Sequence, residues 1–222
     1  MRTILQTANS TELLIIFAGW GMDETVFGHL AAGNQDVLYC FDYTEPGELA
    51  WPDLAAKYRR ISLLAWSFGV FAAGCCCAGR SFERALAVNG TLTPVDDRFG
   101  ITEAVFQATL ENWSETVRHK FFRRMNDDQM TNRFFSAHPL RRTLESQRLE
   151  LESLAAQAAG SRSPANCFDT VLIGRRDRIF PPRAQHCAWD REPAVRQIEA
   201  DLPHYPFAVF DNYREIFHFD GN

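Results

Sequence analysis

The sequence predicts an α/β fold, in which a mostly parallel β-sheet is covered by helices on both faces. Short apolar runs of strand length alternate along the chain with helix-like stretches. These runs are almost continuously apolar, as expected for parallel strands buried on both faces. With 222 residues, of which 46% are hydrophobic and 23% charged, the chain suits one globular domain or one domain carrying a modest insertion.

The predicted strands are rich in branched and aromatic residues, which pack well in a buried sheet. In chain order they cover residues 13–19, 36–43, 61–67, 84–90, 170–174 and 194–200. Residues 2–8 are expected to add an antiparallel strand at the edge of the sheet. Helices are expected between the first strands, at residues 23–31, 51–58 and 70–79.

The alternation of strands and helices breaks between residues 92 and 163. Helical patterns follow one another there, at 101–113, 115–125 and 140–159, without a convincing strand. Parallel sheets bind ligands beyond the carboxyl ends of their strands. We therefore expect residues 1–91 and 164–222 to form an α/β core and residues 92–163 a helical cap over that end of the sheet.

Composition and charge argue against several classes of protein. The net charge of −5 is unlike that of a nucleic-acid-binding protein, and no apolar run reaches the roughly 18 residues of a membrane-spanning helix. The N-terminus lacks the order of a secretory signal, so a cytoplasmic protein is expected. The six cysteines lack metal-site spacing, and we expect them to be reduced residues used as small hydrophobes, with no metal site.

A candidate nucleophile, Ser67, lies in the segment Ala65-Trp66-Ser67-Phe68-Gly69, between a predicted strand and a helix of small residues. In α/β hydrolases the nucleophile occupies such a turn, usually written G-x-S-x-G, where small residues prevent a clash between strand and helix. Ala65 stands where the first glycine is usual. The pentapeptide alone is equally compatible with a small polar residue in a buried segment.

Candidate acid and base residues follow the late strands, in the chain order that an α/β hydrolase requires. Asp177 lies in the loop after 170–174, and His204 lies between two prolines in the loop after the last strand. Asp96 and Asp97 follow the strand 84–90 and are alternatives for the acid. Asp177 is favoured because it precedes the histidine by the usual single strand-and-helix interval.

The glycines around Trp20, in Gly19-Trp20-Gly21, indicate a loop that approaches the nucleophile closely. Acyl transfer needs backbone N–H groups aimed at the developing oxyanion. In this fold one comes from the residue after the nucleophile and one from a loop after an early strand. The backbone N–H groups of Trp20 and Phe68 are therefore the candidate oxyanion donors.

Five segments of the chain have a family-like sequence: FAGWGMD (17–23), LLAWSFGV (63–70), AVNGTLTPVDDRFGI (87–101), FFRRM (121–125) and LPHYPF (202–207). On these segments the chain resembles, over essentially its whole length, the BioG-type pimeloyl-[acyl-carrier protein] methyl ester esterases of bacterial biotin synthesis, and more distantly the BioH esterases. The first and third of these segments are more specific than the serine turn, which many hydrolases share.

The resemblance implies a serine esterase that needs no cofactor and whose partner is an acyl-carrier protein. Ser67 would attack the methyl ester of the pimeloyl chain, His204 would transfer the proton, and Asp177 would orient His204. A serine esterase or thioesterase of other specificity is the alternative, followed by a non-catalytic binding protein of the same fold. The oligomeric state is not predicted.

An acidic carrier protein requires a basic surface near the pocket, and the predicted cap is rich in basic residues. The candidate docking residues are Arg118, Lys120, Arg123, Arg124, Arg141 and Arg142. Alternatively these residues form solvated helix faces paired with nearby glutamates, which are Glu111, Glu115, Glu145 and Glu150. Five phenylalanines are expected to line an acyl tunnel or to form the core of the cap: Phe106, Phe121, Phe122, Phe134 and Phe135.

Overall fold

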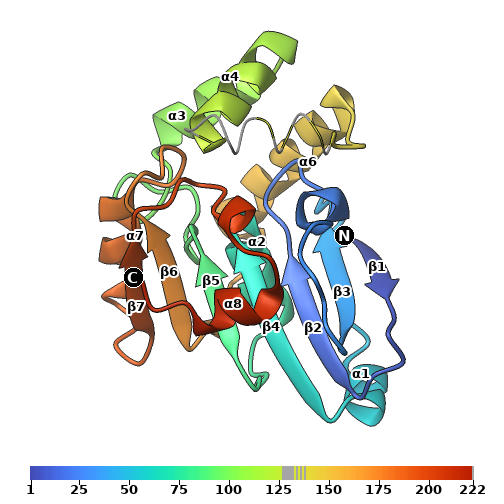
Figure 1. Ribbon diagram of the computed structural model, residues 1–222. Helices are drawn as coiled ribbons and strands as arrows, with labels where there is room; N and C mark the ends of the chain where they lie inside the picture. Colours follow the sequence, from blue (N-terminus) through green and yellow to red (C-terminus); the bar gives the residue numbers. More distant parts are fainter. Residues whose placement is uncertain (127–132, 134, 136, 138, 222) are drawn as a thin grey trace.

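The computed structural model describes residues 1–126, 133, 135, 137 and 139–221. The described residues form a seven-stranded sheet with the order β1-β3-β2-β4-β5-β6-β7, in which only β1 runs antiparallel to its neighbour (Figure 1). The strands are β1 (Arg2–Gln6), β2 (Glu12–Phe17), β3 (Asp36–Phe41), β4 (Arg60–Trp66), β5 (Ala85–Val88), β6 (Thr170–Gly174) and β7 (Arg196–Ala200).

All the predicted strands are confirmed, including the antiparallel edge strand β1. Burial follows position in the sheet: every residue of β3 and β5 is buried, whereas every residue of β1 is exposed. Edge strands need only one ladder of hydrogen bonds and tolerate this exposure. The apolar side chains of the inner strands form one continuous core.

The α-helices with described bounds are α1 (Trp51–Lys57), α2 (Phe68–Cys76), α3 (Glu103–Glu111), α4 (Glu115–Asn126), α6 (Leu144–Ala156), α7 (Pro182–Trp189) and α8 (Tyr213–His218). Helix α2 is largely buried and packs against β2 and β4, which its small residues Ala72, Ala73 and Gly74 allow. A turn of π-helix, Gln157–Ser161, follows α6.

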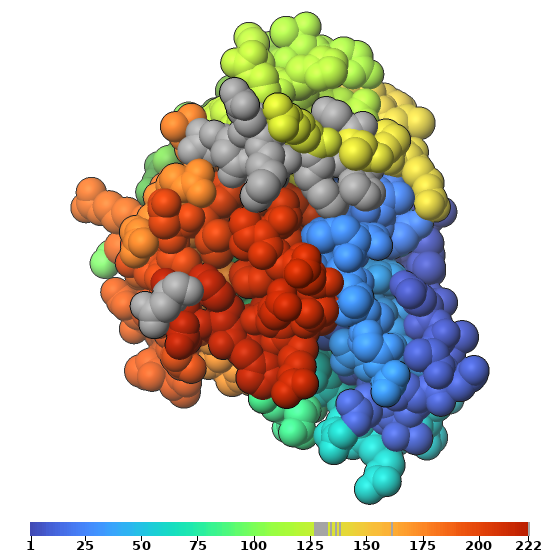
Figure 2. All heavy atoms as spheres, in the orientation of Figure 1, coloured from blue at the N-terminus to red at the C-terminus, as the bar shows by residue number. Residues whose placement is uncertain are grey.

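The prediction of a helix at 23–31 is wrong in its extent. Only a single 3₁₀ turn, η1 (Glu24–Phe27), forms there, and Gly28 ends it by donating its N–H to the Thr25 carbonyl. The chain then leaves the helical path because the Ala31 N–H donates to the Asp211 carbonyl at 2.9 Å. This contact places the C-terminal segment against the N-terminal part of the molecule, as the adjoining red and blue surfaces of Figure 2 show.

Helices α3, α4 and α6 lie together over one end of the sheet (Figure 1). Between residues 92 and 163 the described part of the chain contains no strand, only an isolated bridge between Val95 and Ile101. The arrangement is compatible with the expected core and cap, and the division at residues 91–92 and 163–164 stays a prediction.

The six cysteines are all free. Burial raises the pKa of the Cys75 thiol to about 11 and also raises the pKa of Cys40, so both are thiols at neutral pH. No helix among the described residues combines the length and apolar character needed to cross a membrane.

Candidate active site

Ser67 occupies a sharp turn between β4 and α2. Its φ of 59° and ψ of −129° lie outside the regions that a residue with a side chain prefers. The turn is held by the Ser67 N–H, which donates to the Val88 carbonyl at 2.9 Å. The following Gly69 must be small, because a Cβ there would lie 2.3 Å from the Phe17 carbonyl oxygen. The strand-to-helix turn expected from the sequence is therefore present.

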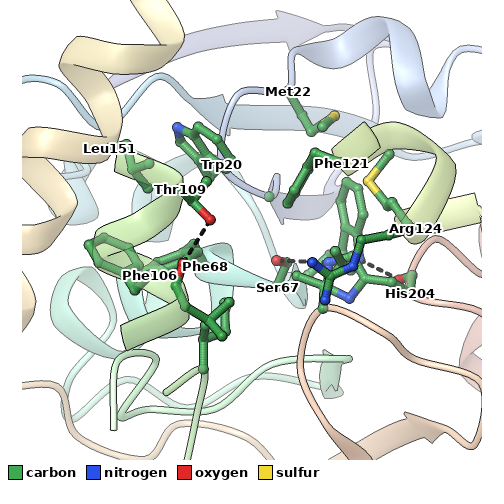
Figure 3. A pocket seen from close by; sticks show the side chains of 16 residues that line it. Trp20, Met22, Ser67, Phe68, Phe106, Thr109, Phe121, Arg124, Leu151 and His204 are labelled. Carbon is green, nitrogen blue, oxygen red and sulfur yellow. Dashed lines mark hydrogen bonds between the residues drawn. The ribbon is translucent and has the colours of Figure 1, made fainter. Parts of the chain in front are cut away.

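Ser67, His204 and Asp177 form one buried chain of hydrogen bonds. His204 Nε2 lies 3.0 Å from Ser67 Oγ (Figure 3), and His204 Nδ1 lies 2.8 Å from Asp177 Oδ2. The three residues are 1–5% exposed. They come from loops after β4, β6 and β7, whose carboxyl ends share one edge of the parallel sheet.

The carboxylate of Asp177 is fixed by three further donors. Its Oδ1 accepts the N–H groups of Ile179 and Phe180 at 2.8 and 2.9 Å, and its Oδ2 accepts from Gln185 Nε2 at 3.1 Å. With His204, four donors surround a carboxylate that is 5% exposed, so both of its oxygens are satisfied and held in place.

The alternative acids lie elsewhere. Asp96 accepts the N–H groups of Arg98 and Phe99, at 2.7 and 2.8 Å, and Asp97 accepts the N–H of Glu103, the first residue of α3, at 3.0 Å. Both carboxylates therefore shape the chain between β5 and α3. Of the three candidates, Asp177 is the one that contacts His204.

The backbone of His204 is held by two side chains that sequence reasoning missed. Asn89 Nδ2 donates to the carbonyls of Pro203 and His204, both at 2.9 Å, and the Trp66 indole donates to the His204 carbonyl at 2.8 Å. Asn89 Oδ1 in turn accepts the Gly174 N–H at 2.7 Å. The available signal was a polar residue directly after a buried strand, within the family-like segment 87–101.

The loop after β2 passes directly beside Ser67. A Cβ built on Gly19 would lie 3.2 Å from the Ser67 Cβ. The Phe68 N–H is the first of helix α2 and has no acceptor within the helix. Among the described residues, no hydrogen-bond acceptor is present for it or for the Trp20 N–H. Two backbone donors beside a serine hydroxyl are the arrangement that an oxyanion requires.

A cavity of about 40 Å³ opens beside Ser67 (Figure 3). Its walls are mostly apolar and come from the loop after β2 and from α3, α4 and α6. Two of the five phenylalanines, Phe106 and Phe121, line this cavity, whereas Phe122 and Phe135 line a different one. Phe134 lies outside the described residues.

Four of the six candidate docking residues are exposed: Lys120, Arg123, Arg124 and Arg141. Arg118 is half-buried, and its guanidinium donates to the Arg142 carbonyl at 3.3 Å. Arg124 also lines the Ser67 cavity, at the side of His204 (Figure 3).

The expectation that Arg142 is available for docking is wrong. Its side chain is 3% exposed and pairs with Glu150 at 3.0 Å and Asp42 at 3.2 Å, because a buried guanidinium needs compensating charge. Glu150 is likewise fully buried and is not part of a solvated helix face. The described residues contain no group of three His, Cys, Asp or Glu side chains suited to holding a metal ion.

The chain is similar to esterases of one family. A family model described as pimeloyl-ACP methyl esterase BioG matches residues 1–216. The crystal structure of selenomethionine-substituted BioG from Haemophilus influenzae superposes with a TM-score of 0.89 and 35% sequence identity, covering 98% of this chain and 100% of that chain.

The chain is also similar in sequence to part of a longer protein, and similar in fold to a more distant esterase. A malonyl-[acyl-carrier protein] O-methyltransferase from Bacteroides fragilis is 36% identical over 183 residues, which are 81% of this chain and 37% of that protein. A crystal structure of an aryl esterase from Burkholderia cenocepacia, 16% identical, superposes with a TM-score of 0.63 over 93% of this chain and 89% of that chain. Together with the sheet order, these likenesses confirm the expected α/β-hydrolase fold.

Proposed function

Because the chain belongs to the pimeloyl-ACP methyl esterase family BioG, we propose that it hydrolyses the methyl ester of pimeloyl-[acyl-carrier protein] in biotin biosynthesis. The observation that carries the proposal is the hydrogen-bonded chain from Asp177 through His204 to Ser67, at the wall of an apolar cavity.

In the first half of the reaction Ser67 forms an ester with the substrate. The Ser67 oxygen attacks the carbonyl carbon while His204 Nε2, 3.0 Å away, takes the hydroxyl proton. The resulting imidazolium is stabilised by Asp177, which accepts the Nδ1–H. The carbon–oxygen bond to the methoxy group then breaks, and His204 returns its proton to the departing methanol.

In the second half a water molecule replaces methanol. His204 takes a proton from the water, whose oxygen attacks the acyl-enzyme carbonyl, and the bond to Ser67 Oγ breaks as the serine recovers its proton. The products are a free carboxylate and the regenerated hydroxyl. In both halves the N–H groups of Trp20 and Phe68 bind the oxyanion of the tetrahedral intermediate.

The cavity favours a small apolar ester group. Its volume of about 40 Å³ holds only a few groups the size of a water molecule, so it suits the methyl ester end of an acyl chain and not the whole chain. The rest of the substrate would extend toward α4, where Lys120, Arg123 and Arg124 are exposed. The name of the Bacteroides fragilis relative also includes an acyl-carrier protein, which supports a carrier-bound substrate. The cytoplasmic location remains a prediction.

The test is methanol release from methyl pimeloyl-[acyl-carrier protein], with a short-chain methyl ester that lacks a carrier as the comparison. We expect the carrier substrate to have the higher kcat/KM, and Ser67→Ala to lose about 10⁶-fold in kcat. Equal kcat/KM for both esters would favour an esterase of other specificity. Full activity in Ser67→Ala would overturn the serine mechanism.

A further inference from the structure

The loop that carries Trp20 is hydrogen-bonded by helix α6 and by a residue just before that helix. Three side chains take part, from Arg142, Gln147 and Glu150, and these residues are 5%, 1% and 0% exposed. They bond to the backbone of Gly21 and Met22, on both the N–H and the carbonyl side. Gln147 and Glu150 are buried together with Leu151 and Leu154 of the same helix, so they lie on its inner face.

Glu150 ties together two segments of the core. Its Oε2 accepts the Gly21 N–H at 3.0 Å and its Oε1 accepts the Tyr43 N–H at 3.0 Å, while Arg142 Nη1 lies 3.0 Å from Oε2. The Tyr43 hydroxyl then donates to the Ala18 carbonyl at 2.7 Å, at the start of the same loop. One buried carboxylate is therefore connected to both ends of the loop 18–22.

Gln147 holds the turn itself. The Met22 N–H donates to the Gly19 carbonyl at 3.2 Å, and Gly21 has a φ of 72°, so residues 19–22 have the features of a type II turn. Gln147 Nε2 donates to the Gly21 carbonyl at 2.9 Å, and the Gln147 carbonyl accepts the Trp20 indole N–H at 2.7 Å. None of these bonds uses the backbone N–H of Trp20, which stays available beside Ser67.

Stability alone does not explain the buried cluster of Arg142, Gln147 and Glu150. Burying an ion pair costs desolvation free energy that well-packed apolar residues avoid. Burial also raises the pKa of Glu150 to about 7, although Arg142 and two N–H donors oppose that shift. What the cluster does provide is a fixed direction for each bond, and small displacements of a catalytic group are costly to the rate.

We propose that Glu150, supported by Arg142 and Gln147, is a positioning residue that holds the Trp20 N–H in place for the oxyanion. This inference rests on the proposed function, because it assigns to helix α6 the control of one donor in that site. It acts on the transition state and not on substrate binding, since the oxyanion exists only after Ser67 attacks.

The test compares Glu150→Gln with the parent enzyme on methyl pimeloyl-[acyl-carrier protein]. The amide keeps the shape of the side chain, but its nitrogen cannot accept an N–H. We expect kcat to fall about 10- to 100-fold with KM nearly unchanged. A trifluoromethyl ketone analogue, which forms an anionic adduct with the serine, should lose affinity by the same factor. The control is Glu152→Gln on the same helix, an exposed partner of Arg148 that should keep parent values.

A second variant covers the case in which Glu150→Gln does not fold. Gln147→Met removes the donor to Gly21 and also an amide oxygen, Oε1, that has no hydrogen-bond partner among the described residues. The lost donor to the Gly21 carbonyl lowers stability, and removal of the unpartnered amide oxygen offsets part of that loss, so we expect the variant to remain folded and yet to lose about 3- to 10-fold in kcat.

Two outcomes separate the inference from the proposed function. If the folded Glu150→Gln variant, or Gln147→Met in its place, keeps the parent kcat and ketone affinity while Ser67→Ala is inactive, the positioning role is overturned and the esterase mechanism stands. If Ser67→Ala is itself active, the proposed mechanism fails, whatever the other variants do.

Discussion

At the scale of single residues, the imidazole of His204 is held from three directions. Asp177 accepts at Nδ1, Asn89 and the Trp66 indole fix the backbone carbonyl, and the Phe180 ring lies parallel to the imidazole within 7° at 6.1 Å. Because the ring is already oriented, the reaction does not have to restrict the rotation of His204 before Nε2 accepts the proton of Ser67. The orientation of His204 is thus fixed by side chains from three other parts of the chain.

The identity of the acid can be tested by two matched substitutions. Asp177→Asn keeps Oδ1 but offers an amide group to Nδ1, which favours the wrong imidazole tautomer, so we expect kcat to fall about 10⁴-fold. Asp97→Asn should keep kcat close to that of the parent, because that carboxylate contacts Glu103 and not His204. Steady-state methanol release measures both. A large loss in Asp97→Asn with none in Asp177→Asn would assign the acid differently.

The three residues of the candidate triad could be predicted from the sequence because this fold places them at regular positions, each after a strand. Ser67, Asp177 and His204 each follow a strand, and the ends of parallel strands meet at one edge of the sheet. The groups that hold His204 could not be predicted in this way. Asn89 and Trp66 reach its carbonyl across 115 and 138 residues of sequence, and only the packed structure brings them together.

At the scale of elements, one buried carboxylate fixes the connection between β1 and β2. Asp36, the first residue of β3, accepts the N–H groups of Ala8 and Ser10 at 2.8 and 3.1 Å. Its second oxygen accepts from the Tyr58 hydroxyl at 2.7 Å and from Lys57 Nζ at 3.1 Å. Burial alone would raise the pKa of Asp36, but these donors outweigh it and hold the pKa below its usual value.

Replacing this carboxylate should weaken the fold in a pH-dependent way. Asp36→Asn places an amide NH2 group where an oxygen accepted from Lys57 and Tyr58, so donors face each other without an acceptor. We expect the free energy of unfolding at pH 7 to fall by about 2–4 kcal/mol. Since the folded-state pKa is lowered, the stabilisation is fully present above about pH 4 and is lost as the pH falls toward the folded-state pKa. Urea unfolding from pH 6 to pH 3 should therefore show a shallower loss of stability in Asp36→Asn than in the parent. Parallel curves would contradict this role.

The ends of the strands were predicted more accurately than the helical segment 23–31. Strands β2, β3 and β4 lie in long apolar runs and were predicted to within two residues at each end. The segment 23–31 has apolar residues at helical spacing, but tertiary contacts of Asp23 and Ala31 determine its path. Asp23 accepts the Arg141 N–H at 2.8 Å, a contact that no local pattern indicates.

At the scale of the whole molecule, charge is distributed unevenly. The chain carries a net charge of −5, yet helix α4 presents exposed Lys120, Arg123 and Arg124, of which Arg124 lines the cavity beside Ser67. A basic surface on an acidic protein attracts an acidic partner locally and acts mainly on the rate of association.

Charge reversal on α4 tests this docking proposal. For Arg123→Glu we expect kcat/KM on the carrier-bound substrate to fall about 5- to 10-fold at low salt, with no change on a methyl ester that lacks the carrier. Arg59→Glu, an exposed residue next to the start of β4 at the opposite end of the strand from Ser67, is the matched control and should keep the parent value. Loss on both substrates would indicate a damaged active site instead of a docking surface.

Ionic strength gives an independent test of the same surface. Salt screens charges separated by more than about 10 Å at 0.1 M. Raising the salt from about 0.05 M to 0.5 M should therefore lower kcat/KM for the carrier-bound substrate and leave that for the small ester unchanged. Equal salt dependence for the two substrates would argue against electrostatic docking.

The most direct test of the whole account is the site at which a fluorophosphonate probe modifies the protein. A serine activated by His204 at 3.0 Å should react, and mass spectrometry of the peptides should find a single adduct, on Ser67, that is absent after His204→Ala. Active enzyme that is not labelled at Ser67 after treatment with the probe, or labelled enzyme that still releases methanol at the parent rate, would contradict the account.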